Sequence, residues 1–146
     1  MSDDTAFMRT ALEEADKALA EGNYPFGAVV VQDDRLVARG HNLVHTDSDP
    51  TAHGEVVAIR AACRALHTTT LEGATLYTTC EPCLMCTSAI MWAGIGRVVI
   101  GATWADAPGY FHPEKGSLLG MASHLRYPFQ YTAGVLREEC VKLYEE

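Results

Sequence analysis

The segment ATLYTTCEPCLMCTSAIMWAGIGRVVIGA, residues 74–102, restricts the possible folds of this chain more than any other stretch. Residues 74–79 are rich in β-branched and aromatic side chains, and residues 97–102 form a short apolar run, so both are predicted as strands. Between them we expect a helix that begins with Pro82 at its first position and ends at Gly94. A strand, a helix and a strand in this order form a crossover unit, which places the two strands parallel in one sheet.

Segments outside this unit extend the sheet and cover it. Hydrophobic periodicity and turn residues predict strands at Phe26–Val31 and Leu36–His41, joined by an Asp33-Asp34 turn, and helices at Thr5–Ala20, at about His53–Leu66 and near Leu136–Tyr144. The expected fold is α/β, with three layers, α/β/α, around a mixed sheet of about five strands. The chain contains no repeat or linker, so residues 1–146 are expected to form a single domain.

Charge and hydropathy narrow the classes of partner. The chain has 11 Lys and Arg against 19 Asp and Glu, a formal net charge of −8, and no basic cluster. Because tight binding of nucleic acid usually needs a basic face, the expected partner is a small molecule and not a nucleic acid. The acidic N-terminus does not resemble a signal peptide, and no apolar stretch approaches the roughly 20 residues that span a bilayer. We therefore expect a cytoplasmic location and no membrane contact.

The cysteine pattern predicts a metal site. Of the five cysteines, Cys83 and Cys86 lie three apart at the start of the predicted helix, where the helix dipole lowers thiol pKa values. His53 opens another helix on the same side of the sheet and is the expected third ligand. Two thiolates and one imidazole favour zinc, and three protein ligands leave a fourth position open, as in catalytic sites. Cys80 belongs to the end of the strand and is not expected to be a ligand.

Glu55 is the candidate catalytic residue. Inside a helix, two residues that are two positions apart diverge by about 200°, so His53 and Glu55 could not face one site from there. At a helix entrance, with His53 at or before the cap, both can do so. A carboxylate beside a zinc-activated water can take a proton from it and pass that proton to a substrate nitrogen.

These residues match a known signature. His53-Gly54-Glu55 and Pro82-Cys83-Leu84-Met85-Cys86 fit H-x-E…P-C-x-x-C, the signature of zinc deaminases, and the chain resembles the cytidine deaminase-like superfamily through about residue 106. Within the superfamily, the stretches YPFGAVVV…GHN, DPTAHGEVVAIRAAC and TLYTTCEPCLMC look like guanine and plant guanosine deaminases. Fungal cytosine deaminases and tRNA adenosine deaminases share parts of the same stretches.

The resemblance implies a zinc-dependent aminohydrolase that acts on a nucleobase or nucleoside, with guanine, converted to xanthine and ammonia, as the first choice of substrate. Zinc would activate the attacking water, and Glu55 would move the protons. The alternatives are a cytosine or isocytosine deaminase, a tRNA adenosine deaminase, or a catalytically silent zinc module. The residues expected to bind substrate are Asn42, the Gly54 amide, the Glu81 carbonyl, Phe26 and Asp106.

Three of these residues also have structural readings. Asn42 could simply end its strand, Phe26 could belong to the core, and Asp106 could cap a turn before Pro108. The resemblance further implies a homodimer, for which residues 88–96, SAIMWAGIG, offer an apolar contact face through Ile90, Met91, Trp92 and Ile95.

Overall fold

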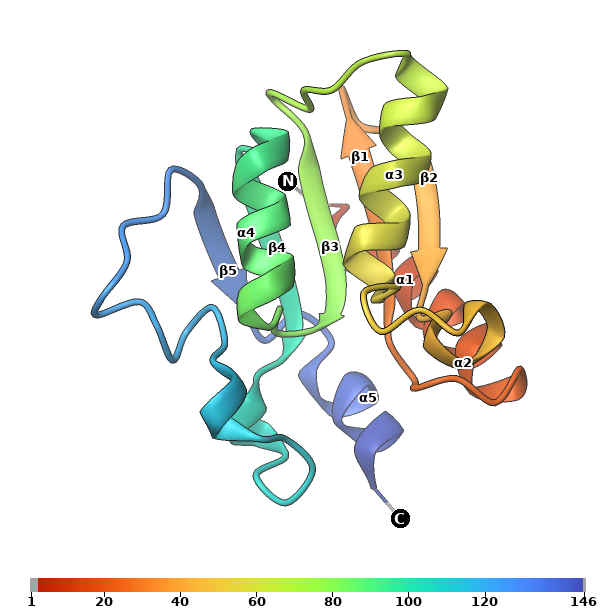
Figure 1. Ribbon diagram of the computed structural model, residues 1–146, viewed down its shortest axis with the longest axis vertical. Helices are drawn as coiled ribbons and strands as arrows, with labels where there is room; N and C mark the ends of the chain where they lie inside the picture. Colours follow the sequence, from red (N-terminus) through yellow and green to blue (C-terminus); the bar gives the residue numbers. More distant parts are fainter. Residues whose placement is uncertain (1–2, 146) are drawn as a thin grey trace.

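A computed structural model describes residues 3–145, and within them five strands form one mixed sheet in the order β2-β1-β3-β4-β5 (Figure 1). The strands are β1 (Gly27–Gln32), β2 (Arg35–His41), β3 (Thr75–Cys80), β4 (Arg97–Ala102) and β5 (Gln130–Ala133). β1 is antiparallel to β2 and β3, whereas β3, β4 and β5 are parallel. The crossover unit predicted from residues 74–102 is thus present, with its two strands side by side.

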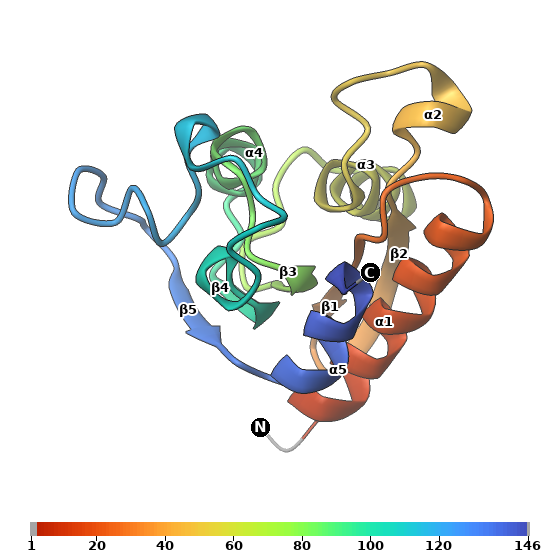
Figure 2. The same ribbon diagram turned by 90° about the horizontal axis from the view of Figure 1, so that it is seen from below.

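Helices cover both faces of the sheet, which confirms the three layers (Figure 2). The helices are α1 (Asp4–Ala20), α2 (Val44–Asp47), α3 (Gly54–Leu66), α4 (Leu84–Ala93) and α5 (Arg137–Val141), with 3-10 turns η1 (Trp104–Asp106), η2 (Pro113–Lys115) and η3 (Lys142–Tyr144). Successive side chains of β1 point to opposite faces of the sheet. Ala28 and Val30 pack in the core beneath α3 and α4, whereas Val29 and Val31 pack in the core beneath α1 and α5. Among the described residues, no helix combines the length and apolar character needed to cross a membrane.

Two glycines allow helices to lie unusually close to the sheet. A Cβ atom at Gly27 would collide with the carbonyl oxygen of Ala11 in α1, and one at Gly40 would collide with the backbone of Ala58 in α3. Glycine at these positions removes the side chain that would otherwise hold helix and strand apart. The close approach holds α1 against β1 and α3 against β2, and in Figure 1 the end of α1 and the start of α3 both lie toward the lower edge of the sheet.

The structure differs from the sequence-based expectation in its loops. The predicted hairpin forms, with Asp33 and Asp34 both at positive φ, 52° and 59°, as a tight two-residue turn requires. Residues 44–47, expected in a polar loop, form the short helix α2. The tail, expected to be irregular up to its last helix, adds β5 at the edge of the sheet.

The two helix starts that carry the predicted ligands also differ in detail. His53 is the N-cap of α3, as the argument from Glu55 requires. Pro82 was expected at the first helical position of α4, but that prediction is wrong, because Cys83 is the N-cap and the helix begins at Leu84. Both helix starts lie near the carboxyl ends of β2 and β3, and the carboxyl ends of strands are the usual location of ligand sites in open α/β sheets.

Candidate metal centre and active site

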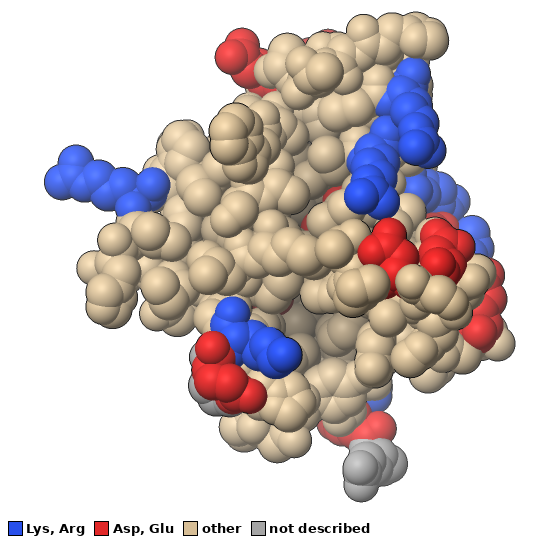
Figure 3. Space-filling model, in the orientation of Figure 1, with Lys and Arg blue, Asp and Glu red and all other residues tan. Residues whose placement is uncertain are grey.

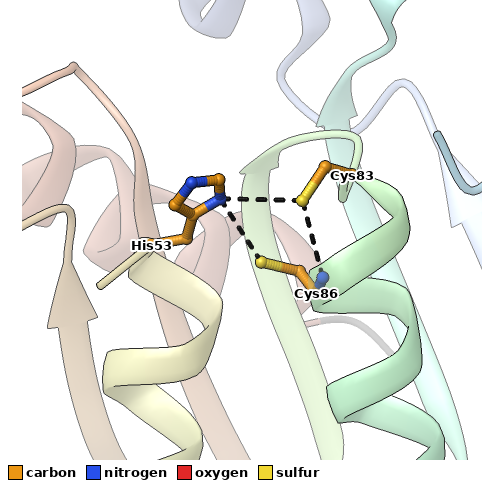
Figure 4. Close-up of side chains that lie close together, drawn as sticks. All are labelled: His53, Cys83 and Cys86. Atoms are coloured by element: carbon orange, nitrogen blue, oxygen red, sulfur yellow. Dashed lines mark hydrogen bonds between the residues drawn. The ribbon is translucent and has the colours of Figure 1, made fainter. Parts of the chain in front are cut away.

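Three side chains converge as a metal-binding group. The Nδ1 atom of His53 lies 3.6 Å from the Sγ atoms of both Cys83 and Cys86, and the three potential ligand atoms all lie within 4.8 Å of one another. Figure 4 shows the imidazole of α3 pointing between the two sulfurs at the start of α4. Of the described residues, only these three form such a group, and Cys80 is not part of it.

Helix capping explains how the chain brings these atoms together. Cys83 has an extended backbone, and its Sγ accepts the N–H of Cys86 at 3.5 Å, so the cap itself turns both sulfurs to one side. His53 is also extended, with φ −71° and ψ 153°, and therefore does not follow the helical rotation of the residues after it. This break in helical geometry lets His53 and Glu55 face the same space.

The electrostatics of the group fit a bound cation. A hydrogen bond from Cys86, together with the His53 ring, lowers the pKa of Cys83 to about 4. The neighbouring Cys83 sulfur and burial raise the pKa of Cys86 well above its usual value, since a second thiolate would sit beside the first. A divalent metal removes this conflict by binding both thiolates, and a donor set of two sulfurs and one imidazole nitrogen suits zinc.

Glu55 lies beside the metal-binding group with almost no contact with solvent. It is 6% exposed in the first turn of α3 and lines the same cavity as His53 and Cys83. Burial, reinforced by the charge of the Cys83 thiolate, raises its pKa to about 7. A carboxyl group with a pKa near neutrality can both accept and release a proton at physiological pH, as general acid–base catalysis requires.

A cavity of about 700 Å³ opens above these residues, a size typical of small-molecule sites. Its wall is largely aromatic and apolar and is formed by Tyr24, Phe26, Asn42, Pro50, His53, Glu55, Cys80, Glu81, Cys83, Met85, Trp104, Tyr110, Phe111, His112 and Lys115. Figure 3 shows a hollow on the face of the molecule that carries α3 and α4.

Three predicted substrate residues, Asn42, Phe26 and Glu81, line this cavity. Asn42 is 1% exposed, and its Oδ1 accepts the N–H of Val44 at 3.0 Å, which leaves the Nδ2 group as a donor. Gly54 is the first residue of α3, where N–H groups have no acceptor inside the helix. The two predicted donors, Asn42 and Gly54, therefore belong to the ends of neighbouring elements, β2 and α3.

Asp106 caps the turn at the end of β4. Its Oδ2 accepts the N–H of Thr103 at 2.9 Å and pairs with Nε of Arg137 at 3.1 Å. It does not line the cavity. These contacts favour the interpretation of Asp106 as a turn cap, and its contact with substrate stays a prediction.

Glu81 organises the wall above the metal-binding group. Its carbonyl, expected to receive a substrate amino group, accepts a hydrogen bond from the Trp104 indole Nε1 at 3.0 Å. Its carboxylate, 3% exposed, accepts the backbone N–H groups of Trp104 at 2.9 Å and Leu119 at 2.7 Å. One buried residue thus fixes two loops that follow β4.

Sequence reasoning missed the aromatic wall that those loops contribute. Trp104 stacks on Phe111, with 5.3 Å between ring centroids and an interplanar angle of 4°, and Phe111 also contacts Tyr110 and Tyr144. The available signal was the aromatic pair at residues 110–111, a few positions after the carboxyl end of a buried strand. Tyr144 is far away in sequence and carried no such signal.

Comparisons with known proteins connect this site to a family. Residues 1–102 match the cytidine and deoxycytidylate deaminase zinc-binding region. The chain is 41% identical to the tRNA-specific adenosine deaminase of Bacillus subtilis (strain 168) over 145 residues, which cover 96% of this chain and 85% of that protein. It is 52% identical to the guanine deaminase of the same organism over 83 residues, 57% of this chain and 53% of that protein. The structure of the guanine deaminase from Nitrosomonas europaea matches with a TM-score of 0.84 and 29% identity, over 95% of this chain and 81% of that one.

The first of these relatives corrects one expectation. The acidic net charge predicted that nucleic acid is not a partner, but a relative named for its action on tRNA is similar along almost the whole chain. Net charge averages over the entire surface, whereas a contact with RNA depends on the groups around one site. The overall charge was therefore insufficient ground for excluding nucleic acid.

Proposed function

The chain belongs to the family that shares the cytidine and deoxycytidylate deaminase zinc-binding region, and from this premise we propose that it deaminates an amino-oxo nucleobase of the guanine type. The observation that carries the proposal is one cavity that combines the metal-binding group, the buried Glu55 and the Asn42 amide beneath aromatic walls. The similarity to two guanine deaminases supports this choice of base.

We assign substrate recognition to groups whose chemistry matches such a base. The Asn42 Nδ2 group and the Gly54 N–H are donors for a ring carbonyl, and the Glu81 carbonyl has a second lone pair that can accept an N–H. The rings of Phe26 and Trp104 provide flat apolar surfaces for a planar heterocycle. Hydrogen bonding at the ring edge and apolar contact with its faces would hold the amino-bearing carbon toward Glu55.

Glu55 carries the proton transfers in this proposal. When bound by His53, Cys83 and Cys86, zinc supplies the Lewis acidity that makes water a nucleophile near neutral pH. The Glu55 carboxylate takes a proton from that water and delivers it to the ring nitrogen beside the amino-bearing carbon. It then takes the remaining proton from the oxygen that has been added to the ring carbon and gives it to the amine as the C–N bond breaks, so each proton passes through a group whose pKa lies near 7.

Asn42→Asp tests the recognition of the carbonyl. The new carboxylate keeps an acceptor for the Val44 N–H and removes only the Nδ2 donor. We expect kcat/KM for guanine and isocytosine to fall about 100-fold, the usual scale for one lost active-site donor, with a smaller loss for adenine, which has no ring carbonyl. Ammonia release measures the rates across guanine, guanosine, cytosine, isocytosine and adenine, and Asn42→Ala controls for the added charge. Equal losses on all bases would contradict this assignment.

A second candidate function is deamination of adenosine in tRNA, favoured by the 41% identity to a tRNA-specific adenosine deaminase over 145 residues. The same purified protein, incubated with an anticodon stem-loop containing adenosine, tests it through inosine formation. Inosine in RNA without ammonia from any free base would replace the free-base proposal. Bound zinc without activity on either type of substrate would support the silent module.

We also propose that the chain forms a homodimer through α4. Trp92 is 89% exposed on this helix, together with Met85, and Figure 3 shows few charged side chains in the middle of this face. Two residues expected in the contact, Ile90 and Ile95, are instead buried in the core beneath α4. An exposed apolar surface of this kind is typical of an interface, and a second copy would cover it.

Trp92→Glu should separate the dimer. Sedimentation should give about twice the 15.9 kDa chain mass for the unaltered protein and the single-chain mass for Trp92→Glu, because the buried charge would have no partner. Leu66→Glu, which alters an exposed apolar side chain on α3, is the matched control and should stay dimeric. A single-chain mass for the unaltered protein at all concentrations would reject the dimer.

A further inference from the structure

His41, the last residue of β2, lies between two carboxylates from another layer of the fold. Its Nδ1 is 2.9 Å from Oε1 of Glu14 in α1, and its Nε2 is 2.9 Å from Oε1 of Glu21, just beyond the end of α1. A neutral imidazole has one N–H and can donate to only one of them. Only the charged ring donates to both, so the geometry selects the imidazolium form.

The surrounding charges are consistent with this state. Glu14, which is buried, also binds Lys17 and Arg39 through its Oε2, each at 2.9 Å. Arg39 reaches Glu13 as well, also at 2.9 Å. On the other side of β2, α3 presents Gly54 and Ala58 to the strand, and the charged residue of its first turn, Glu55, lines the cavity.

His41 is linked, through its contact with Glu21, to the part of the cavity wall formed by Tyr24, Phe26 and Asn42, which we call the substrate wall. Glu21 opens the segment 21–26, which carries Tyr24 and Phe26 to the cavity. At its other end, the Phe26 carbonyl accepts the N–H of Asn42 at 3.0 Å. Gly54 packs against this junction, where a Cβ atom would lie 3.2 Å from the Phe26 oxygen and 3.5 Å from Cα of His41.

We propose that His41 is a positioning residue for this wall: its charged ring ties Glu21 to the end of β2 and so holds Tyr24, Phe26 and Asn42 in the arrangement that binds substrate. This proposal rests on the proposed function of the cavity. Deprotonation of His41 removes one of the two ring donors. Glu14 keeps its bonds to Lys17 and Arg39, so the contact that is lost is the one to Glu21, and one end of segment 21–26 is released. Substrate binding then weakens, whereas proton transfer through Glu55 continues.

The direction of the pH effect follows from the contacts. Burial lowers the pKa of His41, but the hydrogen bonds to Glu14 and Glu21 outweigh it, so the pKa lies above its ordinary value of 6.5. A histidine pKa that folding raises gives stability that is complete below the unfolded value and is lost as pH rises through the folded value. We therefore expect the substrate wall to loosen on the alkaline side of neutrality.

Glu21→Gln is the discriminating variant. The glutamine amide can donate to a neutral Nε2, so His41 no longer needs its charge, and the length of the side chain is unchanged. Between pH 6 and 9.5, KM of the unaltered enzyme should rise at least about 5-fold (a change of ~1 kcal/mol in binding), whereas kcat should follow the ionisation of Glu55 and have the same pH profile in Glu21→Gln. The rise should disappear in Glu21→Gln, and His41→Gln should have a raised KM at all pH values. His67→Asn, at an exposed position after α3, is the control and should follow the unaltered enzyme.

A measurement on the zinc-loaded protein separates failure of this proposal from failure of the proposed function. NMR titration of the His41 ring should give a midpoint above 6.5, and the side-chain signals of Tyr24, Phe26 and Asn42 should shift with the same midpoint, with no substrate present. If the protein deaminates none of the bases but these pH-dependent NMR shifts are present, only the proposed substrate is rejected. Three results would each overturn the role of His41. They are a His41 midpoint at or below 6.5, signals of the substrate wall that do not shift with that midpoint, and a KM that does not rise with pH.

Discussion

Glu55→Gln is expected to abolish turnover and to leave the metal centre intact. Glutamine has nearly the same size as glutamate and can occupy the buried position in the first turn of α3, but it cannot accept and release a proton. We expect kcat to fall by about 10³-fold or more, toward the upper end of the range for loss of a positioned acid–base group. Ammonia release under saturating substrate measures the loss.

The retained zinc makes this result specific. Metal analysis should find about one zinc per chain in Glu55→Gln, because the ligand atoms belong to His53, Cys83 and Cys86. Glu138→Gln, which removes an exposed carboxylate in α5, should keep full activity and serves as the control. Turnover by Glu55→Gln at the rate of the unaltered enzyme would refute the assigned proton transfers.

Removal of either thiolate is expected to cost the protein both its metal and much of its thermal stability. Cys83→Ala and Cys86→Ala each leave two ligands, too few to hold zinc, and they unlink the starts of α3 and α4. With zinc at 1,000 times its Kd, loss of binding removes about 4 kcal/mol from the free energy of unfolding. In a chain of this size that corresponds to a decrease in Tm of about 10 °C.

Two further cysteine variants provide the controls. Cys63→Ala alters a half-buried thiol in α3 outside the metal-binding group, and Cys80→Ser alters the cysteine that lines the cavity without belonging to that group. Both should keep about one zinc per chain by metal analysis, and chelator should lower their Tm as it lowers that of the unaltered protein. Loss of zinc in Cys80→Ser together with its retention in Cys86→Ala would show that the ligand assignment is wrong.

The elements that the sequence predicts correctly are those with local determinants. The Asp33-Asp34 turn, the glycine that ends α4 and the apolar run of β4 each act through residues close together in the chain. β5 has no such determinant, because all four of its residues are exposed and lack the alternation of a half-buried strand. Its conformation depends on pairing with β4, which a local pattern does not record.

The same distinction applies to the site. His53, Glu55, Cys83 and Cys86 could be predicted because helix starts and ligand chemistry are visible in short motifs. Asp106 carried an ambiguous signal, since a short polar side chain near a turn also binds nearby backbone N–H groups, and here that local bond forms.

Local patterns indicate single members of the aromatic wall, such as Phe26 and the pair at 110–111, but not how the rings assemble. Phe26, Phe111 and Tyr144 come from three distant segments, yet their rings lie 5.4–6.3 Å apart by centroid distance. Only the tertiary fold brings them together. A substrate preference that depends on these rings is therefore the part of the function that is hardest to predict from the sequence.

The boundary at the end of β4 has a consequence for how such an enzyme can change. The metal-binding group, Glu55 and Asn42 all precede residue 103, whereas Trp104, Tyr110 and Phe111, which line the same cavity, follow it. Residues 103–129 are joined to the preceding part through backbone contacts: the Glu81 carboxylate accepts the N–H groups of Trp104 and Leu119, and backbone hydrogen bonds link Leu84 to Gly116 and Leu118 to Pro82. Because these contacts use backbone atoms of residues 103–129, we expect side chains in this segment to be replaceable in ways that reshape one wall of the cavity while the metal-binding group and Glu55 keep their positions.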